Sequence, residues 1–384
     1  MTPRNISIHQ YNEGSRVGDG STNTMLLVQE LLTDLGFKSE VFAAGVDPDL
    51  SSRIKHLSEL RPHPDDILLI HHGWYHTHFS RLIALPCRKA LVYHSITPPR
   101  FFDQDPLGRE YSVSAFQQLT KFHRVVEASI ALSPYNARQL RQRDFENITV
   151  LPFHKDFPAV RYAPHRKAPY HDRSAAFRVL YVGRISPHKG QLELVEFAGE
   201  VSKIGDVPLE IVLVGHWEHG REYKAEIDRR IERLGLADRV VFTGSIPDDD
   251  LMGHYRAANA YVSLSNHEGF GIPLIEAMAL DLPVIAYAAG GVPDAMGDAG
   301  ILIHDKAPGT ILGQLRRLHE DRSFRSDMIR RQRQHVLWYG REHIESELRR
   351  WLERMGAFAG FPKLNRAARW RPSSLSDSGF RLTS

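Results

Sequence analysis

The sequence predicts an α/β protein made of two doubly wound, Rossmann-like domains that face each other across a cleft. Three observations support this prediction. The chain has 384 residues, which is more than a single hydrophobic core usually supports. Short apolar runs alternate with amphipathic helical patterns along most of the chain, which indicates parallel sheets covered by helices on both faces. A polar stretch with three prolines, Lys155–Ala176, separates the two series of elements and is expected to contain no helix.

The first half contains six short runs with the composition of buried strands. They are Asn5–Gln10, Lys38–Ala43, Ile67–His72, Lys89–Ser95, Ala128–Ser133 and Ile148–Phe153. Thr22–Leu35 carries leucines on one stripe and predicts a helix capped by Thr22 or Asn23. Phe101–Tyr111 is interpreted as a loop. We assign residues 1–160 to an N-terminal domain.

The second half repeats this alternation. Its predicted strands are Arg178–Gly183, Leu209–Gly215, Val240–Thr243, Ala260–Leu264, Pro283–Tyr287 and Gly300–Ile303. Helical patterns lie between them at Gln191–Lys203, Glu222–Leu234, Asp248–Ala258 and Leu274–Leu280. We assign residues 177–338 to a second domain, with residues 161–176 as the linker.

Two further helical patterns, roughly Ser323–Leu337 and Arg341–Arg354, have no strand after them. We expect residues 339–360 to form a C-terminal helix that packs back toward the first domain. Residues 361–384 form a basic tail that we expect to be solvated and flexible. An alternative is weak contact with anionic lipid headgroups, worth about 1 kcal/mol per basic residue near the surface. The charged residues of the tail are Lys363, Arg366, Arg369, Arg371, Arg381 and Asp377.

The composition is that of an ordinary globular protein, with 42% hydrophobic and 25% charged residues, which excludes disordered, collagen-like and disulfide-scaffold proteins. The 49 basic residues exceed the 46 acidic ones too little to indicate nucleic acid as the main partner. The single cysteine, Cys87, fits a reducing compartment. The polar N-terminus predicts no signal peptide, and no apolar run approaches a membrane span. We therefore expect a soluble cytoplasmic protein, peripheral on the inner face of the membrane if the tail binds lipid.

The most informative motif is Asn266–Glu276, NHEGFGIPLIE, which follows a predicted strand and leads into a predicted helix. Its glycines allow a ligand to approach the backbone closely, and amides at a helix start favour anionic groups. Its two carboxylates, Glu268 in the loop and Glu276 in the expected first helical turn, can each accept from two hydroxyls, as a ribose or a sugar ring offers. Taken singly, Glu276 could be an ordinary helix-start carboxylate and Glu268 a solvated acid, but the complete string favours a binding loop.

A second motif, Val182–Gly190, VGRISPHKG, follows the strand that opens the second domain. Arg184 and Lys189 lie five residues apart on a strand-to-helix turn with flanking glycines. Arginine offers a planar fork and lysine a point charge, so the two could hold a diphosphate. Alone, this motif could equally be a solvated basic turn, and it lacks the spacing of a Walker loop.

Together these motifs resemble the retaining glycosyltransferases of family 4, which have the two-domain fold called GT-B. The resemblance is densest between Arg178 and Ile303, where it also includes Leu213–Gly215, Val241–Gly244 and Gly290–Asp294. Asp294 stands where the family usually has a glutamate.

The first half resembles the family more loosely. Gly18-Asp19-Gly20 is similar to the family's N-terminal glycine loop. Tyr93–Pro99, YHSITPP, is similar to a Tyr-His-Asn-Ile-Thr-Pro signature of mannosyltransferase-like subgroups that build surface polysaccharides, often from GDP-mannose, with Ser95 in place of the asparagine.

The resemblance implies a role for each matching residue. Arg184 and Lys189 would bind the nucleotide diphosphate, Glu276 the ribose hydroxyls, and Glu268 the donor sugar. His94 would face that sugar from the first domain. The remaining residues implied for nucleotide-sugar binding are Gly18, Gly20, Gly183, Gly215, Thr243, Gly244, Gly269, Phe270 and Gly271, and those near Phe242–Ser245 would frame the base.

The chemistry of the reaction is consistent with these roles. Breaking a glycosyl–phosphate bond leaves a diphosphate with growing negative charge. Paired cations and helix-start amides stabilise this charge, and losing one such contact costs ~3 kcal/mol, or about a hundredfold in rate. We therefore expect no metal and no cofactor beyond the nucleotide-sugar donor.

Other candidate sites are weaker. Asp-x-Asp metal signatures could be sought at Asp47–Asp49, Asp103–Asp105 or Asp248–Asp250, but each lies in a turn or helix start, where aspartate caps. Gly18–Gly20 lacks the third glycine of a dinucleotide fingerprint. Cys87 has no evident histidine–acid partner, and we consider it structural.

Four histidines, His71, His72, His76 and His78, surround Trp74. They invite comparison with a metal site, yet no carboxylate or cysteine lies in register with them. We expect them to line the cleft or contact the acceptor.

The leading hypothesis is a retaining glycosyltransferase that moves a hexose, with mannose slightly preferred, from a nucleotide diphosphate-sugar to a glycan or polyprenyl-linked saccharide in surface polysaccharide synthesis. The alternatives are a sugar-nucleotide epimerase or phosphorylase on the same fold, and a non-catalytic subunit that binds nucleotide sugars.

Overall fold

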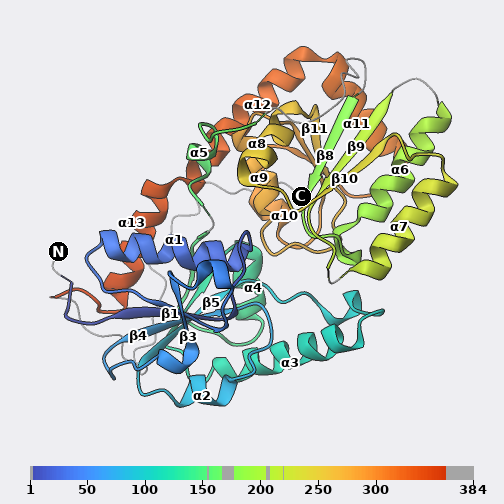
Figure 1. The fold of residues 1–384 in the computed structure, drawn as a ribbon. Helices are drawn as coiled ribbons and strands as arrows, with labels where there is room; N and C mark the ends of the chain where they lie inside the picture. Colours follow the sequence, from blue (N-terminus) through green and yellow to red (C-terminus); the bar gives the residue numbers. More distant parts are fainter. Residues whose placement is uncertain (1–2, 154, 167–176, 205–207, 219, 360–384) are drawn as a thin grey trace.

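The computed structural model describes residues 3–153, 155–166, 177–204, 208–218 and 220–359, and every structural statement below refers to these residues. They form two α/β domains, each built around a parallel sheet, and helices α12 and α13 run along one side of the molecule from the second domain to the first (Figure 1).

The N-terminal domain contains a seven-stranded parallel sheet with the order β3-β2-β1-β4-β5-β6-β7. Its strands are β1 (Ile8–Gly14), β2 (Val41–Gly45), β3 (Ile54–His56), β4 (Ile67–His72), β5 (Arg88–Tyr93), β6 (Ala128–Ala131) and β7 (Ile148–Val150). The helices are α1 (Gly20–Asp34), α2 (Phe79–Ala84), α3 (Pro106–Phe122) and α4 (Pro134–Arg141), with 3₁₀ turns η1 (Pro48–Leu50), η2 (Leu57–Glu59) and η3 (Pro99–Phe101).

The second domain has a six-stranded parallel sheet with the order β10-β9-β8-β11-β12-β13. Its strands are β8 (Phe177–Val182), β9 (Leu209–Val214), β10 (Val240–Gly244), β11 (Ala260–Ser263), β12 (Val284–Tyr287) and β13 (Ile301–Ile303). The helices are α5 (Phe157–Val160), α6 (Gln191–Ile204), α7 (Arg221–Arg233), α8 (Asp248–Ala257), α9 (Ile272–Ala279), α10 (Val292–Met296), α11 (Pro308–Glu320) and α12 (Arg322–Val336), with 3₁₀ turns η4 (Pro187–Lys189) and η5 (Leu337–Tyr339). The last helix, α13 (Arg341–Arg354), follows this domain in the chain. The two sheets confirm the predicted fold class.

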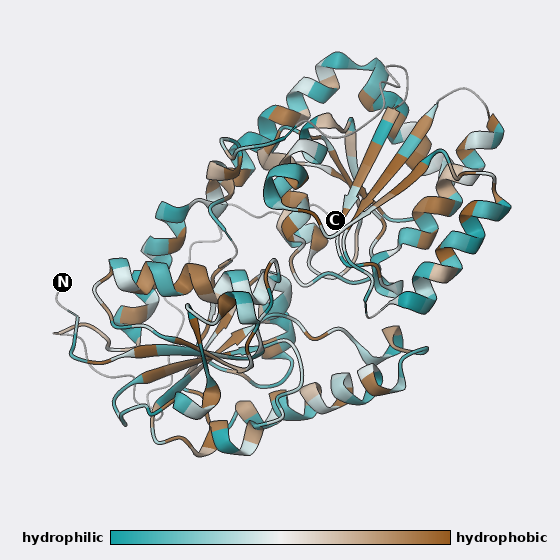
Figure 2. Ribbon diagram, viewed as in Figure 1, coloured by the Kyte–Doolittle hydropathy of each residue, from teal (hydrophilic) through white to brown (hydrophobic). Residues whose placement is uncertain are grey.

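Both sheets are buried between helices, which explains why their central strands are rich in apolar residues. Every residue of β4 and of β9 is buried. In Figure 2 the strands are mostly brown, whereas the outer sides of the helices are mostly teal. Among the described helices, none is both long enough and apolar enough to serve as a membrane span.

Helix α13 belongs to the hydrophobic core of the N-terminal domain although it is the last helix of the chain. Its Ile344, Leu348 and Trp351 are buried in one cluster with Val28 and Leu31 of α1. The main chain closes this end of the molecule, because the amide of Arg4 donates to the carbonyl of Ala357. The chain thus crosses between the domains twice, which restricts how far they can move apart.

Three structural expectations require correction, and one strand was not predicted. Helix α1 is capped by Asp19, whose carboxylate accepts from the amide of Thr22, so the cap is neither Thr22 nor Asn23. Phe157–Val160 forms the short helix α5, and its two end residues are buried in the second core, so Lys155–Ala176 is not free of helix. Phe101–Tyr111 is loop only in part, since α3 begins at Pro106. The edge strand β3 was not predicted, because it has only three residues.

Candidate active site

The strand order of each sheet reverses at one point, between β1 and β4 in the first domain and between β8 and β11 in the second. Ligands of open parallel sheets bind outside the carboxyl ends of the strands at such a point. The Val182–Gly190 motif follows β8 and the Asn266–Glu276 motif follows β11, so both lie at this edge of the second sheet. The fold therefore brings the two most informative motifs together.

Lys189 and Glu268 connect the two motifs directly. The Lys189 ammonium lies 2.7 Å from both carboxylate oxygens of Glu268. Their side chains are 18% and 14% exposed, so water screens this ion pair only partly. The loop that carries Glu268 is also held by Asn266, whose amide oxygen accepts from Lys306 at 2.8 Å.

Glu276 is the fifth residue of α9 and not part of its first turn, and only 4% of it is exposed. Its two oxygens accept from the Lys155 ammonium at 2.5 Å and from the Tyr255 hydroxyl at 2.8 Å. Burial lowers the pKa of Lys155, but Glu276 outweighs this effect and the pKa is raised overall. The sequence reasoning missed both partners. Lys155 lies in the stretch interpreted as linker, and nothing in the sequence distinguishes Tyr255 from an ordinary core tyrosine.

The hydroxyl of Tyr261 on β11 lies close enough to both Glu268 and Glu276 for each carboxylate to affect its pKa. Burial raises the pKa of this tyrosine, and both carboxylates raise it further. The two glutamates therefore lie near the same buried side chain and not on separate surfaces.

Arg184 follows β8 and remains exposed to solvent. Partial loss of hydration lowers its pKa, while Asp19, Tyr181 and Glu268 act in the opposite direction. Asp19 belongs to the N-terminal domain and Glu268 to the second, so Arg184 lies within electrostatic reach of both domains. Among the described residues, no carboxylate lies within ion-pair distance of its guanidinium.

The first domain approaches the same loop at Gly269. A Cβ atom at this position would lie 2.7 Å from the Cβ of Ser95 and 3.0 Å from the carbonyl oxygen of His94. The Gly269 carbonyl also accepts from the Ser133 hydroxyl at 2.8 Å. Only glycine fits here, because any side chain would collide with the facing domain.

Phe270, which the sequence placed in the ligand site, is instead a core residue. It is 6% exposed and its ring lies 5.4 Å from that of Tyr339 and 6.4 Å from that of Phe157. The loop turns at Gly271, whose φ of +95° is in the left-handed region, and this turn directs the Phe270 side chain inward. Only the backbone of Phe270 can then face a ligand.

The other predicted glycines lie at strand or helix ends near the same edge. Gly20, the first residue of α1, approaches Ile272, the first residue of α9, since a Cβ on Gly20 would lie 3.3 Å from the Ile272 side chain. Gly183 and Gly215 follow β8 and β9 and pack backbone to backbone. The remaining positions are Gly18, before α1, and Thr243 and Gly244, at the end of β10, where Gly244 lies next to the Trp217 ring.

His94 follows β5 and is half-buried. Burial lowers its pKa to about 4, and Asp19 partly opposes this shift. One ring nitrogen, Nε2, lies 2.9 Å from Nδ1 of His71, whose own Nε2 lies 3.0 Å from the side-chain oxygen of Gln10. His94 is thus neutral near pH 7 and is supported by a buried polar chain.

His72 and His76 do not line the cleft, contrary to expectation. His72 is fully buried and its Nε2 lies 3.0 Å from the Ala115 carbonyl, while His76 is 1% exposed. Strand β4 continues to His72, so His71 and His72 point to opposite faces of the sheet, and His72 packs under α3. His71 is buried too, but it reaches His94.

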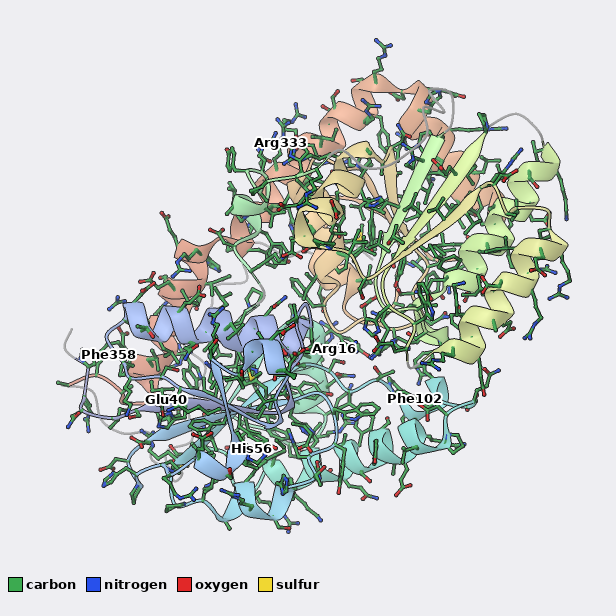
Figure 3. All side chains as sticks on the ribbon, viewed as in Figure 1. Arg16, Glu40, His56, Phe102, Arg333 and Phe358 are labelled. Atoms are coloured by element: carbon green, nitrogen blue, oxygen red, sulfur yellow. The ribbon has the colours of Figure 1, made fainter. Side chains whose placement is uncertain are left out.

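Contacts between the domains surround this region. Arg138 forms a two-pronged ion pair with Asp294, at 2.8 and 3.2 Å, and Arg16 pairs with Glu218. The Phe101 ring lies within 6 Å of the rings of His188 and His267. Figure 3 shows Arg16 and Phe102 on the side of the first domain that faces the second, and Phe358 at the opposite end.

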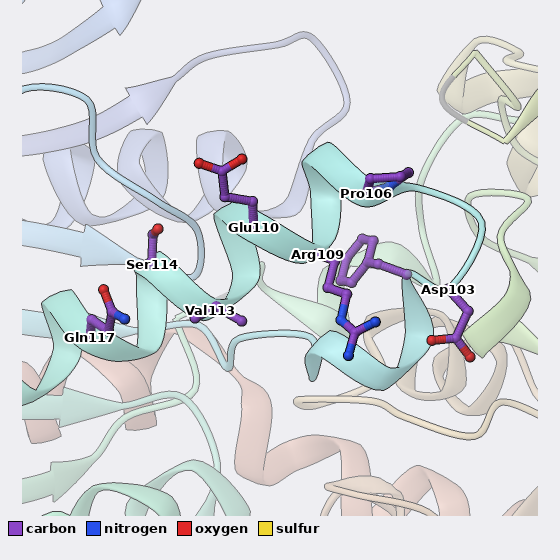
Figure 4. Close-up of a pocket in the computed structure, with 8 residues that line it drawn as sticks. Asp103, Pro106, Arg109, Glu110, Val113, Ser114 and Gln117 are labelled. Atoms are coloured by element: carbon purple, nitrogen blue, oxygen red, sulfur yellow. The ribbon is translucent and has the colours of Figure 1, made fainter.

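A separate pocket of about 480 Å³ lies along the outer side of α3. Pro106, Arg109, Val113 and Gln117 follow one another along the helix at this pocket (Figure 4). They face away from the buried side of α3, and none of the predicted site residues lines the pocket.

Two of the three Asp-x-Asp signatures serve as helix caps. Asp47 accepts from the amide of Asp49, and Asp105 accepts from that of Gly108. Asp248–Asp250 form the first turn of α8. Within the described ranges, no three His, Cys, Asp or Glu side chains form a group that could hold a metal ion.

Comparison with known proteins finds a family match in the second half of the chain. Residues 168–335 match the family described as Glycosyl transferases group 1. A D-inositol 3-phosphate glycosyltransferase of Arthrobacter sp. (strain FB24) is 29% identical over 221 residues, covering 56% of this chain and 50% of that protein. Its counterpart in Acidothermus cellulolyticus is 33% identical over 158 residues, covering 40% and 35%. The chain thus spans half or less of the length of these relatives.

Solved structures resemble nearly the whole chain. Anabaena HepE in complex with UDP has a TM-score of 0.69 at 17% identity and covers 90% of this chain and 99% of its own. Sucrose-phosphate synthase from Thermosynechococcus elongatus has a TM-score of 0.71 at 19% identity and covers 91% and 99%. The two parallel-sheet domains have the GT-B fold of glycosyltransferases.

Proposed function

We propose that this protein is a retaining glycosyltransferase that transfers a hexose from a nucleotide diphosphate-sugar to a saccharide acceptor. The observation that carries the proposal is the direct contact of Lys189 with Glu268 at the strand-order reversal of the second sheet. Arg184 lies within electrostatic reach of the same carboxylate, and Glu276 lies on the helix that follows. This arrangement suits a ligand that has phosphate at one end and hydroxyl groups at the other.

Donor binding then proceeds as an exchange of partners. The diphosphate replaces Glu268 as the partner of Lys189, and Arg184 binds it with a planar fork of donors. The released Glu268 carboxylate accepts from hydroxyls of the donor sugar. Glu276, held by Lys155 and Tyr255, accepts from the ribose hydroxyls.

In the reaction, the bond between the anomeric carbon and the leaving phosphate oxygen breaks while the acceptor hydroxyl forms a bond to the same carbon. The electron pair goes to the diphosphate, which also receives the acceptor's proton, so no separate base is needed. Arg184 and Lys189 stabilise the developing charge. His94 holds the sugar from the other domain.

For the donor, the Tyr93–Pro99 segment favours GDP-mannose, whereas Anabaena HepE was solved with UDP and with UDP-glucose. We propose mannose, with UDP-glucose as the competing donor in the test. For the acceptor we propose a glycan or polyprenyl-linked saccharide of surface polysaccharide synthesis. The curated relatives are named for D-inositol 3-phosphate, which belongs in the acceptor panel.

The test compares Lys189→Ala and Glu268→Ala with Lys55→Ala. Lys55 forms an ion pair of the same 2.7 Å length with Glu40, but in the first domain and away from the motif loops. Transfer is measured with GDP-mannose and UDP-glucose over an acceptor panel. Either site variant should lose about a hundredfold in rate, and Lys55→Ala should not. Wild-type rates in Lys189→Ala or Glu268→Ala would refute the proposal.

The basic tail supports a second, independent proposal of peripheral membrane contact. Residues 360–384 lie outside the described structure, so the argument rests on their charge alone. Sedimentation with vesicles, with and without anionic lipid, compares the full chain with one ending at residue 359. Equal partitioning in all four samples would rule out the contact.

A further inference from the structure

A chain of hydrogen bonds runs from the core of the first domain to His94. The amide nitrogen of Gln10 on β1 lies 2.9 Å from the carbonyl oxygen of Met25 in α1. The amide oxygen of Gln10 lies 3.0 Å from Nε2 of His71 on β4, and Nδ1 of His71 lies 2.9 Å from Nε2 of His94. Gln10 and His71 are both 0% exposed, so water does not reach these contacts.

The chemistry of the first link fixes the direction of every later one. A main-chain carbonyl can only accept, so the Gln10 amide nitrogen must face Met25 and its oxygen must face His71. His71 must then carry its proton on Nε2. Burial lowers the pKa of His71 well below its usual value, so the ring is neutral and its Nδ1 is an acceptor. His94 must therefore carry its proton on Nε2.

This leaves Nδ1 of His94 with a free lone pair. Among the described residues this atom has no hydrogen-bond partner, and it is not one of the fully buried unpaired nitrogens. The backbone of His94 meets Gly269, the residue that follows Glu268. The free nitrogen thus belongs to a residue at the contact between the two domains, next to the loop proposed to bind the donor sugar.

We propose that Gln10 and His71 are positioning residues that hold His94 as the neutral Nε2–H tautomer, so that Nδ1 accepts a hydrogen bond from a sugar hydroxyl. Nδ1 of His94 then favours a ligand group that can donate a hydrogen bond. A ligand group that can only accept would find no donor at this atom. The tautomer follows from the structure alone, whereas the identity of the hydroxyl rests on the proposed function.

The first experiment observes the tautomer directly and needs no activity. Nitrogen-15 NMR of histidine-labelled protein distinguishes protonated from unprotonated ring nitrogens, and the signals that vanish in His94→Gln belong to His94. We expect Nδ1 unprotonated and Nε2 protonated. In His71→Leu, which removes the acceptor, the two tautomers should mix. A protonated Nδ1 in the wild type, or an unchanged spectrum in His71→Leu, would overturn the proposal.

The matched control is His72→Leu. His72 is the next residue on β4, equally buried, but points to the other face and contacts the Ala115 carbonyl. Both leucine variants lose a buried histidine, so a merely structural role predicts similar losses of stability and rate. We expect only His71→Leu to lower kcat, by about tenfold, the effect of about 1.4 kcal/mol of misplacement. His71→Asn keeps an acceptor and should recover most of this loss.

The two readouts separate the possible failures. If the protein transfers no sugar from any donor while the tautomer is as expected, the proposed function fails and the positioning role stands. If transfer occurs and His71→Leu and His72→Leu lower kcat equally, the positioning role fails and the function stands.

Discussion

Replacing Lys155 with methionine tests whether this lysine stabilises the buried carboxylate of Glu276. Methionine keeps much of the length and apolar character of the lysine side chain but removes the charge. Glu276 would retain one hydrogen-bond partner among the described residues, the Tyr255 hydroxyl at 2.8 Å, while remaining 4% exposed. A buried carboxylate that loses its cation is destabilising because neither water nor protein replaces the lost interaction.

The magnitude follows from the burial of the pair. Removing one partner of a fully buried ion pair costs roughly 3–5 kcal/mol. The Lys155 side chain is 32% exposed, so water screens part of the interaction and we expect a smaller cost. We estimate about 2 kcal/mol, which lowers the melting temperature of a domain of this size by about 4–8 °C.

Urea and thermal unfolding followed by circular dichroism would measure this change. Lys55→Met is the control, because Lys55 forms a surface ion pair that water screens. Adding Glu276→Gln to Lys155→Met should restore part of the lost stability, since a neutral amide needs no cation. A shift no larger than that of Lys55→Met would refute the reasoning.

Three further perturbations test other parts of the structure. Phe270→Ala should lower the free energy of unfolding by roughly 3 kcal/mol, measured in urea, because this ring packs among core aromatic rings. Burial raises the pKa of Glu13, but hydrogen bonds outweigh it and lower the pKa to about 2. Ionised Glu13 therefore stabilises the fold above pH 4.5, so Glu13→Gln should be less stable by about 2 kcal/mol at pH 6 and equally stable near pH 2. Arg138→Glu would place a second carboxylate opposite Asp294 at the contact between the domains. The two carboxylates would repel each other, so small-angle X-ray scattering should detect a larger radius of gyration. Adding Asp294→Arg should reverse this change.

The sequence predicted the central strands well because both sheets are buried. Ile67–Ile70 and Ile211–Val214 are continuous apolar runs, and such a run is typical of a strand that is covered on both faces. The same reasoning could not find β3, whose three residues at the sheet edge carry two exposed side chains. It also missed α5, because a single helical turn stabilised by packing leaves no periodic pattern.

The predicted binding residues came together for a reason visible in the sequence, since loops that follow parallel strands gather at one edge of the sheet. Their partners could not be predicted in this way. Lys155 reaches Glu276 across 121 positions of sequence, and Gln10 reaches His71 across 61. The burial of the Phe270 side chain was not predicted either, because a motif fixes the order of residues but not the side to which each one points.

The charges of the site suggest how an anionic ligand would enter it. Lys189 and Lys155 each already neutralise a glutamate, so neither offers an uncompensated charge. Among the described residues of the two motifs, Arg184 is the cation that is exposed and has no carboxylate at ion-pair distance. It is therefore the group that a diphosphate would meet first. In the proposed function, the charge of the diphosphate would then compete with Glu268 for Lys189, and the carboxylate would become free only as the phosphate arrives. This order of events would prevent Glu268 from facing the cleft as an unpaired charge that repels the donor.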